Sequence, residues 1–350
     1  MKIALDATYS LGAHLSGVGL YSREILAGLA AAHPEAQLLF CYRPQRFVRS
    51  FSAPLPPNCR RRLLQEPWVP RSADLFHGLN QRLPTVRLRR TVTTFHDLFV
   101  LTGDYSTPEF RRRFQQLARH AAANSDLIVT VSQFTARQVE QLLGVEPSRL
   151  RVIPHGVRVP VCNPAEAAAR PHPAREPMVL HVGAIQSRKN VSRLIEAFTQ
   201  LGPHWRLVLA GSFGFGAEEI LHAIQTSPRR DNIEVRGYVS TDQLASLYRR
   251  ASMLAFPSLD EGFGMPVLEA MAWGLPVLTS NRSALPEVAG DAALLVDPTD
   301  VEAIAAGLRE LAHNETLRQD LISRGRIRAS QFTWPAAVEK TWSVYRQLLP

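Results

Sequence analysis

Two glutamates in one glycine-rich stretch have the types and the spacing to bind a ligand rich in hydroxyl groups. Glu261 and Glu269 both belong to EGFGMPVLEAMAWGLPVLTS, which follows the apolar run Met253–Phe256. The apolar run predicts a buried strand, and Pro266 is well placed for the first turn of a helix. The two carboxylates therefore fall where a strand leads through a loop into a helix. The alternative is that Glu269 complements the helix dipole and Glu261 is a solvated loop acid.

The loop between the two glutamates can also offer backbone N–H groups. Phe263, Gly264 and Met265 stand at the predicted start of the helix, where the first N–H groups have no acceptor within the helix. Such groups bind phosphate and sugar oxygens, and a glycine lets the backbone approach a ligand closely. We expect this loop to lie at the edge of a parallel sheet where ligands bind.

A basic pair precedes another predicted helix. Arg188 and Lys189 lie in HVGAIQSRKN, after the predicted strand Met178–Val182. Paired cations at such a position can neutralise a diphosphate. Lys189 is one of only three lysines in the sequence, which indicates that a compact point charge is needed there. The alternative is an ordinary pair of surface bases.

The first half of the chain contains a histidine–aspartate pair. His96 and Asp97 end the run TVTTFHD, in which the preceding residues predict a short buried strand. A histidine at the carboxyl end of a parallel strand can bond a sugar hydroxyl or move a proton. The alternative is a structural histidine that is bonded to its neighbours.

Two glycines near the N-terminus mark another candidate site. Gly17 and Gly19 flank the start of the predicted helix Val18–Ala31, where backbone N–H groups could meet a phosphate. A dinucleotide fingerprint is excluded, because Ser22 occupies the position of the last glycine in G-x-G-x-x-G. The next predicted strand, Gln37–Tyr42, also lacks the acid that would bind an adenosine ribose.

The string EGFGMPVLEAMAWGLPVLTS resembles the signature of glycosyltransferase family 4, a family of retaining enzymes with the GT-B fold. The resemblance covers nearly all of the chain and is weakest over residues 44–90. It implies transfer of a sugar from a nucleoside-diphosphate donor to a hydroxyl acceptor, without a cofactor or a metal ion. Overall similarity favours mannose from GDP-mannose, transferred to a glycan or lipid-linked acceptor in the synthesis of surface polysaccharide such as lipopolysaccharide.

The resemblance gives the candidate residues distinct roles. Glu261 would contact the transferred sugar, and Glu269 would accept hydrogen bonds from both ribose hydroxyls. The basic pair would stabilise the departing diphosphate. The resemblance also places the nucleotide base near Tyr238 and Val239, and His96–Asp97 beside the donor sugar. The glycine loop Gly17–Gly19 would touch the donor phosphate or the acceptor.

Strands and helices alternate through both halves of the sequence, which predicts an α/β protein with parallel sheets. We expect two facing, doubly wound Rossmann-like domains, with the ligand in the cleft between them and closure about a hinge. The expected parts are an acceptor-binding domain over 1–162, a linker over 163–177, a nucleotide-sugar domain over 178–332 and a final helix over 333–350. Trp334, Trp342 and Tyr345 would anchor that helix to the first domain.

The net charge of +9 is concentrated in the first half. Residues 1–160 hold 21 basic and 11 acidic residues, which gives +10, and residues 161–350 hold 19 and 20, which gives −1. The excess predicts either peripheral association with an anionic membrane or simply arginine-rich solvated faces. Nucleic-acid binding is disfavoured, because no recognition motif accompanies the charge.

The other compositional features favour a soluble, cytoplasmic protein that could work at the inner face of the membrane. The N-terminus has no signal-peptide pattern, and no apolar run is long enough to span a bilayer. Cys41, Cys59 and Cys162 show no metal-ligand spacing and are typical of reduced thiols. Two rival functions stay open: a glycoside hydrolase or phosphorylase that uses Glu261 and Glu269, and a non-catalytic sugar-nucleotide-binding protein.

Overall fold

A computed structural model describes residues 1–12, 14–158 and 175–349, which form two compact units. Unit 1 comprises Met1–Gly156 and Phe332–Pro350, and unit 2 comprises Val157–Gln331. Most of the expected linker, residues 163–174, lies outside the described residues. The last residues of that expected linker are structured, because the first strand of unit 2 already begins at Glu176.

Unit 1 is built on a parallel sheet of seven strands in the order β3-β2-β1-β4-β5-β6-β7. The strands are β1 (Lys2–Asp6), β2 (Gln37–Tyr42), β3 (Cys59–Leu63), β4 (Leu75–Gly78), β5 (Thr91–Phe95), β6 (Leu127–Thr130) and β7 (Leu150–Val152). The strands β1, β5 and β6 are buried along almost their whole length, because both faces of this sheet are covered by helices.

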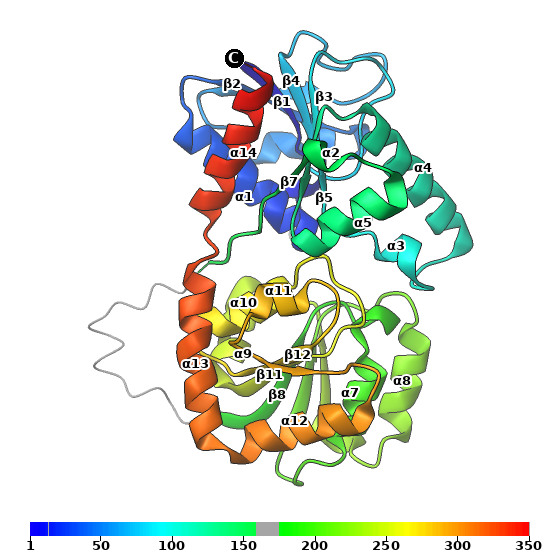
Figure 1. Ribbon diagram of the computed structural model, residues 1–350, viewed down its shortest axis with the longest axis vertical. Coiled ribbons are helices and arrows are strands. Elements are labelled where there is room, and N and C mark those ends of the chain that lie inside the picture. Colours follow the sequence, from blue (N-terminus) through cyan, green and yellow to red (C-terminus); the bar gives the residue numbers. More distant parts are fainter. Residues whose placement is uncertain (13, 159–174, 350) are drawn as a thin grey trace, which may run out of the picture. The chain divides into compact units, whose positions relative to one another are not determined.

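Helices cover the two faces of the unit 1 sheet and create two separate cores (Figure 1). The helices are α1 (Gly17–Ala32), α2 (Pro44–Phe47), α3 (Phe99–Thr102), α4 (Pro108–Asn124), α5 (Gln133–Leu143) and α14 (Trp334–Leu348), with 3-10 turns η1 (Thr8–Ser10), η2 (Val48–Ser52) and η3 (Pro147–Arg149). Ile3 and Leu5 pack with α1 and α14, whereas Ala4 between them packs with α4 and α5. This split follows from the alternation of side chains along a strand.

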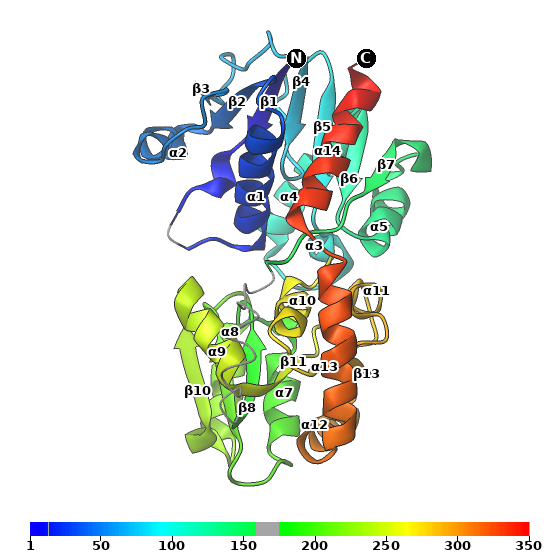
Figure 2. The ribbon, with the colours of Figure 1, turned by 90° about the vertical axis from the view of Figure 1, so that its left-hand side faces the viewer.

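The helix α14 belongs to unit 1 although it follows unit 2 in the sequence, as expected for the final helix (Figure 2). Trp334, Trp342 and Tyr345 are buried in the same core as α1. The hydroxyl of Tyr345 lies 2.6 Å from Nδ1 of His77 on β4. Nε2 of the same ring lies 2.9 Å from Oγ1 of Thr94. His77 is therefore a structural residue that ties α14 to the sheet.

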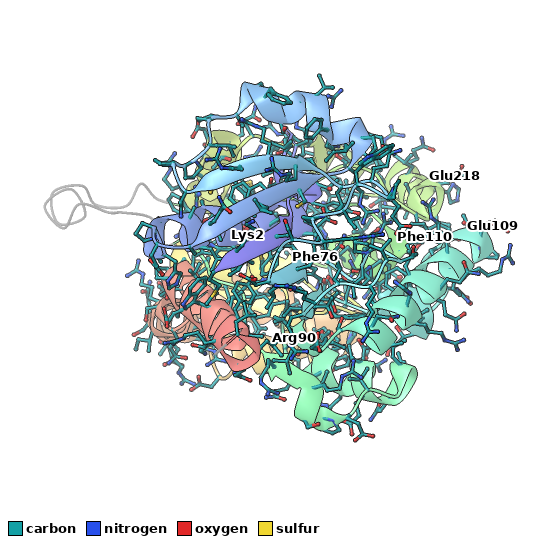
Figure 3. All side chains as sticks on the ribbon, turned by 90° about the horizontal axis from the view of Figure 1, so that it is seen from above. Lys2, Phe76, Arg90, Glu109, Phe110 and Glu218 are labelled. Atoms are coloured by element: carbon teal, nitrogen blue, oxygen red, sulfur yellow. The ribbon has the colours of Figure 1, made fainter. Side chains whose placement is uncertain are left out.

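Two local expectations for unit 1 were wrong. The Pro- and Arg-rich sequence of residues 44–72 predicts an irregular segment, yet this segment contains α2, η2 and the edge strand β3. The helical spacing of apolar residues over 108–123 predicts a core position for Phe110, but its side chain is 51% exposed. Figure 3 shows Phe110 at the outer end of α4, away from the strands that carry Lys2 and Phe76. The core side of α4 instead begins at Phe114.

Unit 2 has a parallel sheet of six strands in the order β10-β9-β8-β11-β12-β13. The strands are β8 (Glu176–Val182), β9 (Arg206–Ala210), β10 (Ile233–Gly237), β11 (Ala251–Phe256), β12 (Val277–Ser280) and β13 (Leu294–Val296). The helices are α7 (Val191–Phe198), α8 (Ala217–Thr226), α9 (Thr241–Arg250), α10 (Met265–Ala272), α11 (Leu285–Ala289), α12 (Val301–His313) and α13 (Glu315–Ser330), with 3-10 turns η4 (Ser187–Lys189) and η5 (Arg230–Asn232). Both units are thus doubly wound α/β folds.

Both sheets reverse their strand order at one point, between β1 and β4 in unit 1 and between β8 and β11 in unit 2. In each sheet the chain moves outward on one side and then returns to build the other side. Ligands of open parallel sheets bind beyond the carboxyl ends of the strands at this reversal. The fold therefore identifies two positions, one in each unit, where a binding site is expected.

Arginine side chains donate hydrogen bonds to the carbonyl groups at the ends of several elements. Arg175 donates through both terminal nitrogens to carbonyl oxygens at the ends of α9 and α10, including those of Tyr248, Ala251, Trp273 and Gly274, at 2.7–3.0 Å. Arg229 similarly donates to the carbonyls of Leu201 and Trp205. The last carbonyls of a helix lack partners within the helix. Part of the arginine content is therefore structural.

Candidate functional site

The strand reversal of unit 2 brings the basic pair and one glutamate together. Arg188 and Lys189 follow β8, and Glu261 follows β11, the neighbouring strand. Nζ of Lys189 lies 2.5 Å from Oε1 of Glu261, and Nη1 of Arg188 lies 3.0 Å from Oε2. Each carboxylate oxygen thus contacts one cation. These three residues, singled out from separate stretches of the sequence, form one cluster.

The cluster is buried, which makes its charges interdependent. All three side chains are at most 10% exposed. Burial alone would raise the pKa of Glu261, but the adjacent charges of Arg188 and Lys189 outweigh it and lower that pKa to about 2. Lys189 also lies 4.7 Å from the centre of the Phe256 ring, a favourable position for a cation. The carboxylate therefore stays ionised at neutral pH.

Backbone and side-chain hydrogen bonds fix the two loops that carry the cluster. The carbonyl of Arg188 accepts from the N–H of Leu259 at 2.9 Å, and its guanidinium donates to the carbonyl of Asp260. The N–H of Glu261 donates to Oγ of Ser283 at 3.1 Å. The carboxylate is consequently held from both sides of the reversal.

Asn190, which the sequence did not single out, joins three loops of unit 2. Its Nδ2 donates to the carbonyls of Pro257 and Pro298, at 3.0 Å and 2.6 Å. Its backbone is left-handed, with φ of 59°, a conformation that asparagine tolerates better than most residues. The only signal in the sequence was an asparagine directly after the basic pair.

The loop Phe263–Met265 leads into α10 at the same edge of the sheet. Gly264 is the residue before the helix, with φ of 104°, and an added Cβ would lie 2.6 Å from Leu285. Only glycine suits this position, both for its conformation and for its space. The N-terminus of α10, with Met265 as its first residue, follows Glu261 closely and presents the positive end of the helix dipole.

Glu269 lies in α10 and has a partner that the sequence did not reveal. The hydroxyl of Tyr248, on α9, donates to Oε2 of Glu269 at 2.8 Å. Burial raises the pKa of Glu269, and the hydrogen bond from Tyr248 opposes that rise. One oxygen is thus fixed by the protein, while the carboxylate retains the capacity to accept further hydrogen bonds. Among the described residues, no hydrogen bond or ion pair joins Glu269 to Glu261.

Tyr238 and Val239 directly follow β10, at the edge of the unit 2 sheet. The side chain of Tyr238 is 42% exposed. These residues occupy the carboxyl end of an outer strand, two strands away from β8. Their role in holding a nucleotide base stays a prediction.

In unit 1, His96 and Asp97 follow the carboxyl end of β5, as expected. Nε2 of His96 lies 2.9 Å from the carbonyl oxygen of Leu79 and therefore carries the proton that it donates. The His96 ring stacks on His155 and meets Tyr21 edge-on, with ring centres 5.4 Å and 4.7 Å apart. Burial lowers the pKa of His96 to about 4, so the ring is neutral at pH 7.

Gly17 and Gly19 open α1, but they do not form an exposed glycine loop. Gly17 is the first residue of the helix, and the N–H of Gly19 donates to Oγ of Ser16 at 3.3 Å. An added Cβ on Gly19 would lie 2.8 Å from the carbonyl oxygen of Tyr9. The glycine at 19 is thus explained by close packing, and a phosphate contact from its amide stays a prediction.

The described residues contain no group of three or more His, Cys, Asp or Glu side chains arranged to hold a metal ion. No helix in the described part of the chain is long and apolar enough to cross a membrane. The chemistry that this chain itself offers is a buried carboxylate bound to two cations at a strand reversal. That arrangement suits a ligand with both a phosphate group and hydroxyl groups.

Two doubly wound units, with this cluster at the strand reversal of the second, are the architecture of GT-B sugar transferases. The glycosyl transferases group 1 model matches residues 163–328, and the glycosyltransferase family 4 model matches residues 15–159. The O-antigen chain mannosyltransferase B of Escherichia coli is 32% identical over an alignment 385 positions long. The alignment covers 99% of this chain and 100% of that protein. The chain belongs to glycosyltransferase family 4, and it is a glycosyltransferase.

Other relatives and solved structures agree with this assignment. The MMP alpha-(1->4)-mannosyltransferase of Mycolicibacterium hassiacum is 30% identical over 67% of this chain and 57% of its own length. The structure of sucrose-phosphate synthase from Thermosynechococcus elongatus superposes with a TM-score of 0.79, at 24% identity over 99% of both chains. The glycosyltransferase WaaG, involved in lipopolysaccharide biosynthesis, gives 0.73 at 18% identity over 98% of this chain and 99% of its own. These structural likenesses confirm the expected fold.

Proposed function

We propose that this enzyme transfers mannose from GDP-mannose, with retention of configuration and without a metal ion, to a glycan or lipid-linked acceptor in surface polysaccharide synthesis. The observation that carries the proposal is the buried cluster of Arg188, Lys189 and Glu261 at the strand reversal of unit 2. Two relatives that are named as mannosyltransferases, one of them for O-antigen, support the choice of sugar and product.

The cluster can supply what the transfer needs. Departure of a diphosphate leaves negative charge on phosphate oxygens and positive charge near the sugar carbon. Arg188 and Lys189 would stabilise the phosphate oxygens, helped by the N-terminus of α10. Glu261 holds both cations in place beforehand, and its carboxylate would then face the hydroxyls and the positive charge of the transferred sugar. Such fixed charges act without reorganisation during the reaction.

Several features support the remaining roles of the proposal. Glu269, held at one oxygen by Tyr248, would accept from the ribose hydroxyls. No protein nucleophile is required if the acceptor attacks the same face of the sugar and its proton passes to the leaving phosphate. His96 would act as a neutral hydrogen-bonding group rather than as a charged acid, because burial lowers its pKa to about 4. The enzyme would work in the cytoplasm, with the basic excess of residues 1–160 drawing it to the anionic inner face of the membrane.

The hydrolase alternative gains no support from the cluster. A glycosidase needs one carboxyl group that stays protonated near neutral pH and a second that acts on the same sugar carbon. The Arg188 and Lys189 charges keep Glu261 ionised, despite its burial, with a pKa of about 2. No observation favours this second function over sugar transfer.

The test is a donor and acceptor screen with matched variants. Thermal unfolding of the full chain is followed with GDP-, UDP-, dTDP- and ADP-sugars, and transfer of radiolabelled mannose to lipid-linked glycan is then measured with EDTA present. We expect GDP-mannose to raise the unfolding temperature most, and Lys189→Ala to lower turnover at least a hundredfold.

Lys340→Ala is the matched control, because Lys340 is an exposed lysine on α14, outside the site. It should retain normal turnover. Near-normal transfer by Lys189→Ala would refute the role of the cluster, and release of free mannose without any acceptor product would favour a hydrolase.

A further inference from the structure

Unit 1 contains a pocket of about 270 Å³ at its own strand reversal. Its lining includes residues that follow three adjacent strands: Thr8 and Tyr9 after β1, Arg43 and Arg46 after β2, and Arg82 after β4. The carboxyl ends of parallel strands meet at one edge of a sheet. The pocket thus occupies in unit 1 the place that the cluster of Lys189 occupies in unit 2.

The pocket is strongly basic. None of the described residues that line it is acidic. Arg43 is engaged with the buried carboxylate of Asp6, with Nη2 and Oδ2 3.3 Å apart. No carboxylate of the described chain lies within ion-pair distance of Arg46 or Arg82. Two guanidinium groups are therefore uncompensated in a confined space.

Further groups of the pocket favour an anion. Ser16 lines the pocket and caps α1, so the positive end of this 16-residue helix is directed to the same region. The first turn of α1 contains no acidic residue that would neutralise it. The hydroxyl of Thr8 accepts from the N–H of Arg43 at 3.2 Å, which joins the loops after β1 and β2.

We propose that this pocket binds a phosphate or diphosphate group of the acceptor substrate. The inference rests on the proposed function, in which unit 2 holds the donor through Arg188 and Lys189. Arg46 and Arg82 would bind phosphate oxygens in the paired geometry that guanidinium groups favour. Arg43, held by Asp6, would fix the position of the loop that carries Arg46.

The segment next to the pocket indicates where the phosphate comes from. α2 and η2 continue directly from the pocket-lining residues and carry Val48 and Phe51, which are 79% and 63% exposed. The guanidinium of Arg61 lies 5.1 Å from the centre of the Phe51 ring, so the exposed aromatic lies beside a positive charge. Exposed apolar groups with basic neighbours suit a lipid chain at an anionic surface. A lipid-linked phosphate is the favoured source, and a soluble phosphate ester is the other.

The experiment measures binding to the full chain by titration calorimetry, with farnesyl diphosphate and inorganic pyrophosphate as probes. The pocket variant is Arg46→Ala with Arg82→Ala. Arg113→Ala with Arg137→Ala is the control for an equal loss of charge, because both arginines are exposed, on α4 and α5, and lie outside the pocket. Lys189→Ala is measured in parallel to separate the phosphate site of unit 2. We expect the pocket variant to weaken farnesyl diphosphate binding at least tenfold, and the control variant to stay within twofold.

Each other outcome is decisive. Equal weakening by the control variant would show general attraction to positive charge. Loss of all binding in Lys189→Ala would show that the phosphate binds to unit 2. Either result would overturn the proposal. A lipid-linked source is assigned if farnesyl diphosphate binds tenfold more tightly than pyrophosphate and Phe51→Ser removes that difference. Equal affinities for the two probes assign a soluble ester. Failure of the wild type to bind any nucleotide sugar, with the pocket intact, would refute the donor function alone.

Discussion

At the scale of single residues, the carboxylate of Glu261 is the group on which the site of unit 2 depends. Its two oxygens contact two buried cations, Arg188 and Lys189. Removing one partner from a buried ion pair leaves charge without compensation and costs about 3–5 kcal/mol. In the proposed reaction the same cations would also donate hydrogen bonds to phosphate oxygens of the donor. Glu261 would then be both a structural counter-ion and a competitor of the donor phosphate.

This double role makes a prediction about Glu261→Gln. The free energy of unfolding should be about 3 kcal/mol lower in the variant than in the wild type. Inorganic phosphate should raise the free energy of unfolding more in the variant than in the wild type. Urea unfolding of unit 2, followed with and without phosphate, measures both effects. Glu140→Gln, at an exposed glutamate of α5, provides the matched control. Equal phosphate effects in variant and wild type would contradict the competition.

The pair of Tyr248 and Glu269 makes a prediction about the ribose. Tyr248→Phe removes the hydrogen bond that fixes one oxygen of Glu269, so the KM for the donor should rise about tenfold with little change in kcat. The affinity of wild type for GDP and for 2′,3′-dideoxy-GDP is compared with that of Glu269→Ala. The wild type should discriminate between the two nucleotides and the variant should not. Retained discrimination in Glu269→Ala would place the ribose elsewhere.

The sequence identifies the charged residues of the site, but it does not identify the residues that fix them in position. Arg188, Lys189 and Glu261 could be found because charged residues interrupt apolar, strand-like runs at glycine-rich turns. Tyr248, Ser283 and Asn190 could not, because each is an ordinary surface-type residue until the fold brings it against its partner. The sequence also could not predict the ion pair of Glu261 with Lys189, because these residues are 72 positions apart.

At the scale of elements, arginine explains how several helix ends are satisfied. Arg175 donates to four carbonyls within 3.0 Å at the ends of α9 and α10, and it lies in the stretch expected to be a linker. Burial lowers the pKa of Arg175, but arginine keeps its charge at neutral pH. Part of the basic excess of the sequence therefore serves to satisfy the carbonyl groups at helix ends. The net charge alone does not reveal this role.

The corresponding prediction concerns Arg175→Gln. Loss of several charged hydrogen bonds to carbonyls should lower the unfolding free energy of unit 2 by about 2–4 kcal/mol. Chemical denaturation measures the change, and Arg230→Gln serves as the control because Arg230 is exposed and pairs with the exposed Asp231. Equal stabilities of the two variants would show that water replaces Arg175 at these carbonyls.

The long strands and helices followed from apolar periodicity, and the errors have physical causes. β3 reads CRRRL, so its alternation is masked by arginines on both faces of an edge strand. Phe110 matched the helical spacing of the core residues, but it belongs to the first turn of α4, which extends beyond the sheet. Periodicity identifies a face of a helix, whereas the neighbours decide how far along that face the core reaches.

At the scale of the whole molecule, buried histidines link stability to pH. Burial lowers the pKa of His77 to about 3, and that of His96 in unit 1 and His181 in unit 2 to about 4. Each ring is neutral when folded and takes up a proton on unfolding once the pH falls below about 6.5. Stability is therefore complete above that pH and falls as the pH drops toward 4, by about 1.4 kcal/mol per pH unit for each histidine.

We accordingly expect unfolding in mild acid, before the carboxylate of Glu261 begins to titrate. Circular dichroism from pH 7 to pH 3.5 measures the midpoint, and the slope of unfolding free energy against pH gives the proton uptake. His77→Gln should lower that uptake by about one proton, while His204→Gln, at an exposed histidine, should leave it unchanged. Full stability down to pH 4 would contradict the role of these rings.

The position of α14 has a consequence for how the chain is made. Three aromatic residues that complete the core beside α1 lie at Trp334, Trp342 and Tyr345, so they leave the ribosome after all of unit 2. The part of unit 1 that is synthesised first therefore lacks these core residues. Its His77 also lacks the hydroxyl of Tyr345 until α14 has been made. Unit 2, whose residues are contiguous, can finish folding sooner. The core of unit 1 can therefore be completed only after all of unit 2 has been translated.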